Sequence, residues 1–107
     1  MKEINVIELK KLLDDNHPIQ LIDVREEWEH AKFNIGGLLI PMGTIKHHFD
    51  KLDLSKKIVF YCRSGSRSGI VAKMLENKYG LKDIYNLKGG MLDWEMQYKK
   101  NYQYINE

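Results

Sequence analysis

The stretch that most constrains this chain covers residues 56–75 and reads KKIVFYCRSGSRSGIVAKML. Its apolar run from Ile58 to Tyr61 places large side chains on both faces, which is typical of a strand in the middle of a covered parallel sheet. A loop of glycine, serine and arginine begins at Cys62, and an apolar helical pattern follows from about Ser66. A strand, a short loop and a helix in direct succession indicate an α/β unit.

The rest of the chain continues this alternation. Asn5 with Glu8 three residues later predicts a capping box, which opens a helix that stops before Pro18. Strands are predicted at 19–24, 38–40, 57–61 and 83–87, and further helical segments at 26–31, 42–49, 66–80 and 89–100. In the helix from Ser66, the side chains expected to face inward are Ile70, Val71, Met74 and Leu75. The pattern predicts an α/β fold, a sheet with helices on both faces.

Composition narrows the class of protein further. A chain of 107 residues is long enough to bury one core and too short for two, so residues 1–107 are expected to form a single domain. The formal net charge of +2, with charges of both signs interspersed, argues against nucleic acid or a membrane surface as a partner. There is no apolar run of ~18 residues and no apolar signal-peptide segment, so a cytoplasmic location is expected. The single cysteine excludes an internal disulfide and a cysteine-based metal site, and no cofactor is expected.

Three loops are expected to meet at one edge of the sheet. Ligands of open α/β sheets bind beyond the carboxyl ends of the strands. Asp23 and Arg25 follow one predicted strand, Pro41 follows another, and Cys62 follows the most buried strand. The thiol is therefore expected at the centre of a binding site.

Residues 62–68, which we call the cysteine loop, have the composition of an anion site. The residues expected to bind the anion are Arg63, Ser64, Gly65, Ser66, Arg67 and Ser68. The small residues allow backbone N–H groups to turn inward, the helix start adds its dipole, and both arginines suit oxyanions. Together they are expected to lower the pKa of Cys62 below the ~8.5 of a free thiol and to make it a nucleophile. The alternative is a buried structural cysteine at the end of a strand.

Two reactions suit a cysteine beside an anion site: phosphoryl transfer and sulfur transfer. Cysteine phosphatases place an arginine six residues after the cysteine, whereas here Arg67 lies five residues after Cys62 and Ser68 takes the sixth position. A loop one residue shorter is too tight to surround a tetrahedral phosphate and still surrounds a single additional sulfur atom. The spacing favours sulfur transfer.

The chain resembles a single-domain rhodanese, a thiosulfate sulfurtransferase-like protein. Three segments carry the resemblance: LIDVREEWEHAKFNIGGLLIP at 21–41, VFYCRSGSRS at 59–68, and NLKGGMLDWE at 86–95 with Gly89, Gly90 and Trp94 in register. The segment KFNIGG at 32–37 departs from the Gly-His-Ile-Pro-Gly-Ala found in many members, which we interpret as a difference in substrate or partner preference. The resemblance implies a central, mostly parallel five-stranded sheet with helices on both faces.

The resemblance also implies a reaction cycle. Cys62 would attack the outer sulfur of thiosulfate or of a persulfide donor and keep it as a persulfide, held by the amides of residues 63–68. Arg67 would orient the loop and the anion, and Arg63 would attract the anionic donor. Because the chain has no second cysteine, an external thiol, a partner protein or cyanide must accept the sulfur. Asp23 and Arg25 are expected to be structural supports, with Arg25 paired to Glu26 or Glu27.

Two other classes of function remain as alternatives. One is a non-catalytic or sensor rhodanese module that binds a partner protein; the cysteine that such modules often lose is present here. The other is a cysteine phosphatase or arsenate reductase, which the short loop disfavours. His47 and His48 are adjacent and therefore do not easily share a metal, and no metal site is expected. Trp28 and Trp94 are expected in the core, while the tail at 101–107 is expected either to pack on the sheet or to mediate dimer contacts.

Overall fold

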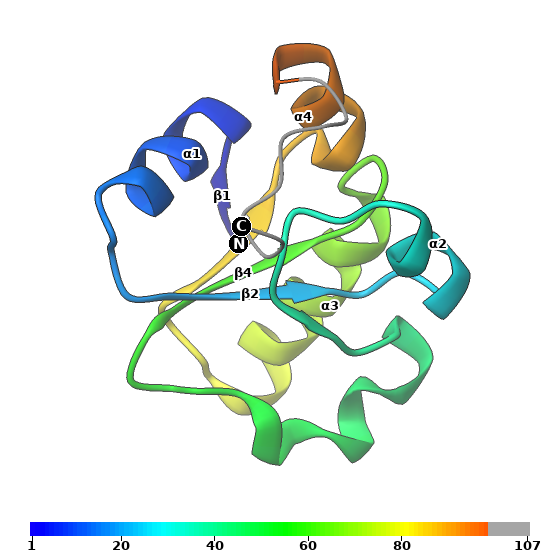
Figure 1. The fold of residues 1–107 in the computed structure, drawn as a ribbon. Helices are drawn as coiled ribbons and strands as arrows, with labels where there is room; N and C mark the ends of the chain where they lie inside the picture. The colour runs from blue at the N-terminus through cyan, green and yellow to red at the C-terminus, as the bar shows by residue number, and fades with distance from the viewer. Residues whose placement is uncertain (99–107) are drawn as a thin grey trace.

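Five parallel strands form the centre of the molecule, in the spatial order β1-β5-β4-β2-β3 (Figure 1). This is a computed structural model, and it describes residues 1–98, so the predicted tail at 101–107 lies outside it. The strands are β1 (Lys2–Ile4), β2 (Ile19–Asp23), β3 (Leu38–Leu39), β4 (Lys57–Tyr61) and β5 (Ile84–Leu87). The predicted five-stranded α/β sheet is confirmed. Four strands were expected by position; β1 was missed because only one of its three residues, Ile4, is buried.

The helices begin and end where local sequence signals place them. They are α1 (Val6–Asp14), α2 (Glu27–Lys32), α3 (Ser66–Tyr79) and α4 (Gly90–Tyr98), with short 3-10 segments η1 (Met42–His47) and η2 (Phe49–Lys51). The capping box of α1 is confirmed, because the Asn5 side chain accepts from the Glu8 amide at 2.8 Å and the Glu8 carboxylate accepts from the Asn5 amide at 2.9 Å. Helix α3 is bounded by Gly65 and Gly80, both with positive φ.

The helices cover both faces of the sheet and form two separate cores. On one face Ile58 and Phe60 pack with Val71 and Leu75 of α3 and with residues of η1. On the other face Val59 and Tyr61 pack with side chains of α1 and α4, among them Leu9, Met91 and Trp94. Successive residues of β4 thus enter opposite cores, which explains why this strand is apolar throughout.

Two hydrophobic side chains expected inside lie outside. Ile70 is 56% exposed, because α3 buries Val71, Ala72 and Leu75 and turns Ile70 away from the sheet. Trp28 is 69% exposed, because α2 is a short helix that buries none of its residues fully. Trp94, in contrast, is fully buried, as expected. Within residues 1–98, no helix combines the length and the apolar character needed to cross a membrane.

Candidate active site

The carboxyl ends of β2 and β4 bring the predicted site residues to one edge of the sheet. Asp23, the last residue of β2, pairs in register with Tyr61, the last residue of β4, and Cys62 follows immediately. The loop before η1 joins the same edge, since the Met42 amide donates to the Val24 carbonyl at 2.9 Å. The three loops expected to meet therefore do meet.

The cysteine loop surrounds the sulfur atom of Cys62 with hydrogen-bond donors. The Gly65 amide lies 3.1 Å from Cys62 Sγ, and both the amide and the hydroxyl of Ser68 lie 3.4 Å from it. Cys62 itself is fully buried beneath the loop. This is a nest of N–H groups around a potential anion.

Glycine at position 65 makes this geometry possible. Its φ of +97° places the residue in the left-handed region, where side chains other than hydrogen are strained. A Cβ atom at Gly65 would also approach the Leu87 carbonyl to 3.2 Å and the Gly89 amide to 3.3 Å. The loop therefore turns tightly over the end of β5, and its amides point at the sulfur.

Helix α4 holds the start of the cysteine loop in place. The amides of Met91 and Leu92, in the first turn of α4, donate to the carbonyls of Cys62 and Arg63, each at 2.9 Å. Gly90 allows this approach, since a Cβ atom there would come within 2.5 Å of the Cys62 carbonyl oxygen. Gly90 thus allows the start of α4 to lie directly against the cysteine loop, although the two segments are far apart in the sequence.

The cysteine loop lowers the pKa of Cys62, as the sequence predicts. Burial alone raises this pKa, because it disfavours the charged thiolate. The hydrogen bonds from the Ser68 side chain and from the amides of Ser68, Gly65 and Ser64 act in the opposite direction and outweigh the burial. A lowered pKa favours the thiolate, which is the nucleophilic form of a cysteine side chain.

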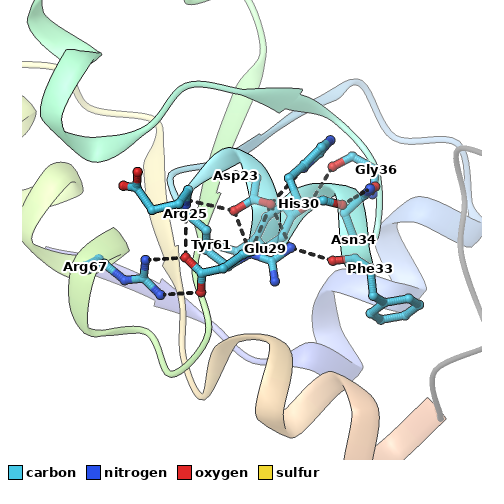
Figure 2. A network of polar contacts seen from close by, with 10 residues as sticks. Asp23, Arg25, Glu29, His30, Phe33, Asn34, Gly36, Tyr61 and Arg67 are labelled. Carbon is cyan, nitrogen blue, oxygen red and sulfur yellow. Dashed lines mark hydrogen bonds and ion pairs between the residues drawn. The ribbon is translucent and has the colours of Figure 1, made fainter.

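The two arginines of the loop have different surroundings. Arg67 forms a two-pronged ion pair with Glu29 of α2, with N–O distances of 2.8 and 3.0 Å (Figure 2). This hydrogen-bonded pair lowers the pKa of Glu29 to about 2. Arg67 thus ties α3 to α2, while Arg63 is exposed at the rim of the loop.

A cluster of polar side chains centred on Asp23 lies next to the pair of Arg67 and Glu29 (Figure 2). Asp23 is fully buried and accepts from Arg25 Nε at 2.9 Å, Arg25 Nη2 at 2.8 Å and the Arg25 amide at 3.0 Å. His30 Nδ1 also lies 2.9 Å from this carboxylate. The expected pairing of Arg25 with Glu26 or Glu27 is therefore wrong, because the turn after β2 folds the arginine back over Asp23.

The segment 32–37 extends this cluster. We call Asp23, Arg25, His30 and Asn34 together the Asp23 network. Asn34 donates to the His30 carbonyl and accepts from the Gly36 amide, both at 2.9 Å. The Tyr61 hydroxyl of β4 donates to the Gly36 carbonyl at 2.8 Å, and Arg25 Nη2 donates to the Phe33 carbonyl at 2.7 Å. These bonds fasten the segment to the sheet, and Asn34 takes part in them through its side chain.

A cavity of about 650 Å³ opens between α2, α4 and the cysteine loop. The exposed side chain of Trp28 forms part of its wall. Its lining residues are Arg25, Trp28, Glu29, Lys32, Phe33, Arg63, Met91, Leu92 and Glu95. The cavity is within the usual size range of small-molecule sites and combines apolar side chains with charged ones. Over residues 1–98, no cluster of three His, Cys, Asp or Glu side chains could hold a metal ion.

Comparison with known proteins identifies the family. The sequence matches the profile of the Rhodanese-like domain over residues 5–97. The chain belongs to the rhodanese-like domain family. It is 41% identical over 100 residues to the Bacillus subtilis protein named "Putative sulfurtransferase YtwF", which covers 92% of this chain and 95% of the relative.

Two further matches bear on fold and class. The "Thiosulfate sulfurtransferase GlpE" of Coxiella burnetii is 30% identical over 88% of this chain and 87% of its own length. The crystal structure of a rhodanese-like domain protein from Staphylococcus aureus superposes with a TM-score of 0.80 at 37% identity, over 88% of this chain and 91% of that one. The resemblance inferred from the three motifs is confirmed, and several relatives of this rhodanese-like domain are named sulfurtransferases.

Sequence reasoning missed two residues that shape the site of this rhodanese-like domain. Glu29 binds Arg67 across 38 positions, a partnership that no local pattern reveals. Asn86, on β5, contacts both Ser68 and Gly65 of the cysteine loop. A polar residue inside the apolar run IYNL was a signal for Asn86, since a buried amide requires hydrogen-bond partners.

Proposed function

We propose that this rhodanese-like domain is a sulfurtransferase that moves sulfane sulfur from thiosulfate or a persulfide donor to an external thiol through a persulfide on Cys62. The observation that carries the proposal is the ring of donors at Cys62 Sγ, with the Gly65 amide at 3.1 Å and the Ser68 amide at 3.4 Å. Such donors stabilise negative charge on sulfur before and after it has accepted a second sulfur atom. The tight loop supports a sulfur-sized ligand rather than a phosphate.

The proposed cycle is redox-neutral and has two displacements. The Cys62 thiolate attacks the outer sulfur of thiosulfate, a new S–S bond forms, and sulfite leaves with the electron pair of the bond that breaks. The acceptor, a thiolate or cyanide, then attacks the outer sulfur of the persulfide, and Cys62 leaves as a thiolate. Both steps place negative charge within reach of the amides of residues 63–68.

The two arginines of the cysteine loop have different roles in the proposal. Arg67 is committed to Glu29, so its role in the proposal is to hold the loop between α3 and α2. Arg63 is exposed and lines the cavity beside the loop, which suits it to attract an anionic donor. Asp23 and Arg25 support the neighbouring turn and contact each other. They take no part in the displacement steps.

The acceptor must come from outside, because Cys62 is the only cysteine of the chain. The cavity next to Arg63 is large enough to receive an organic thiol or the end of a partner protein's sulfur-carrying segment. In this proposal the protein is a single domain that needs no cofactor. It works in the cytoplasm, where thiols stay reduced.

Intact-mass measurement tests the proposal most directly. The reduced protein is incubated with thiosulfate or glutathione persulfide, beside the Cys62→Ser variant. The expected result is a gain of one sulfur atom on the wild type alone, with thiocyanate released when cyanide is added. No gain with either donor would overturn the proposal. Turnover of an aryl phosphate or of arsenate would instead support the phosphatase or reductase alternative.

A further inference from the structure

The side chain of Asn86 is a buried amide that the proposed sulfur-transfer cycle leaves without a role. Asn86 is 3% exposed and lies on β5, the strand next to β4. Its Nδ2 donates to the Gly65 carbonyl at 3.1 Å and to Glu3 Oε2 at 3.3 Å, and its Oδ1 accepts from the Ser68 hydroxyl. Asn86 therefore contacts the cysteine loop at the two residues whose amides lie closest to the sulfur.

These partners determine the orientation of the Asn86 amide group. The Gly65 carbonyl and the Glu3 carboxylate only accept hydrogen bonds, so the amide nitrogen must face them. The oxygen of the same amide then faces Ser68, where it can only accept. The Ser68 hydroxyl must consequently be the donor in that contact.

Ser68 has one hydroxyl proton and two acceptors for it. Its Oγ bonds to Asn86 Oδ1 and lies 3.4 Å from Cys62 Sγ. While Cys62 is a thiol, its S–H donates to Ser68 Oγ and the Ser68 O–H donates to Asn86. Each of these donors then has an acceptor. Once the thiol has lost its proton to water, the sulfur becomes an acceptor, and the Ser68 hydroxyl stabilises it by turning away from Asn86.

We propose that Asn86 is a positioning residue that holds the Ser68 proton away from the sulfur in the thiol state and releases it to the thiolate. Asn86 thereby sets the balance between the two ionisation states of Cys62. The inference rests on the proposed role of Cys62 as the nucleophile. The amides of the cysteine loop favour the thiolate, and Asn86 opposes them by competing for the same proton. This opposition suits a sulfur nucleophile, because intrinsic nucleophilicity falls as the pKa of the thiol falls.

The charged residues around the hydrogen bonds that link Asn86, Ser68 and Cys62 are the same in every variant of the test. They are Arg63 in the loop, Arg67 on α3 with its partner Glu29 on α2, and Glu3 on β1. Cys62 is the only cysteine, so the pH dependence of its alkylation by iodoacetamide reports one ionisation.

A double-mutant cycle tests the proposal with the wild type, Asn86→Ala, Ser68→Ala and the double variant. If Asn86 competes for the Ser68 proton, Asn86→Ala shifts the pKa of Cys62 further downward when Ser68 is present than when it is alanine. The expected difference is on the order of one pKa unit, the worth of one hydrogen bond to a charged group. Asn77→Ala, at an exposed position of α3, is the matched control and should leave the pKa unchanged.

Equal pKa shifts in the two backgrounds would overturn the proposal, because Asn86 would then act on the sulfur without Ser68. If the alanine variant fails to fold, the cycle is repeated with Asn86→Val, since valine is a residue that favours strands. Circular dichroism checks that each variant is folded. Sulfur uptake is measured separately by mass. A coupled pKa without sulfur uptake would refute the proposed function alone, and sulfur uptake with uncoupled shifts would refute this inference alone.

Discussion

The cysteine loop and the Asp23 network lie at the same edge of the sheet and are held together by different groups. The cysteine loop uses backbone amides, positioned by glycine and serine, to surround one sulfur atom. The Asp23 network uses side chains, above all the buried pair of Asp23 and Arg25. A backbone site depends on conformation, so it is sensitive to any added Cβ atom. A side-chain site depends on charge pairing, so it is sensitive to the loss of one partner.

The largest effect is expected in the Asp23 network. Asp23→Ala leaves the guanidinium of Arg25 buried without its carboxylate, which should lower the free energy of unfolding by about 3–5 kcal/mol. Urea denaturation measures the loss. Asp50→Ala, at an exposed position of η2, is the control and should change stability by less than about 0.5 kcal/mol. A loss of similar size in both variants would show that the network does not stabilise the fold.

The next effect concerns the backbone of the cysteine loop. Gly65→Ala places a Cβ atom at a φ of +97°, which should cost about 1–3 kcal/mol of unfolding free energy and slow the alkylation of Cys62. Gly43→Ala is the matched control, because nothing lies within 4 Å of its added Cβ atom. Unchanged Cys62 reactivity in Gly65→Ala would mean that this amide is not needed to hold the thiolate.

A smaller effect is expected at the rim of the cavity. Arg63→Ala should raise the KM for an anionic sulfur donor roughly three- to tenfold and leave kcat nearly unchanged, the effect of losing one partly screened charge contact. Steady-state kinetics with thiosulfate measure it, with Lys73→Ala on the exposed side of α3 as the control. An equal rise in both variants would point to overall charge rather than to Arg63.

The smallest effect is the pH dependence of the ion pair between Arg67 of the cysteine loop and Glu29, which lies beside the Asp23 network. Glu29 has a pKa of about 2 in the folded protein, below its ordinary 4.5, so its pair with Arg67 stabilises the fold above pH 4.5. This stability is lost as the pH falls from 4.5 towards 2. Glu29→Gln should therefore be less stable than the wild type at pH 7, by less than about 1 kcal/mol, and approach it at pH 2. A constant difference between the two proteins in thermal melts across this range would contradict the ion-pair explanation.

The two regions also differ in how far the sequence predicts them. Cys62 and its loop could be placed because the strand, the small residues and the helix start are adjacent in the chain. The partner of Arg25 was mistaken, since sequence order suggests Glu26 or Glu27 and only the turn after β2 shows Asp23. The pairing of Arg67 with Glu29 depends on how α2 and α3 meet, which no local pattern encodes.

The same reasoning applies to the fold. Strands β2, β4 and β5 and the helices with glycine or asparagine at their ends were found, because local preference and burial agree there. Strand β1 escaped because its register with β5, not its own composition, makes it a strand. Trp28 was placed in the core by its residue type, whereas the short helix that carries it has no face to bury.

The bonds from the first turn of α4 to the carbonyls of Cys62 and Arg63 have a consequence for biosynthesis. A ribosome makes Cys62 well before it makes Met91 and Leu92, so a growing chain carries its thiol for some time without the contacts that fix the loop. The start of the cysteine loop is therefore fixed in place only once α4 has been made and has folded against it.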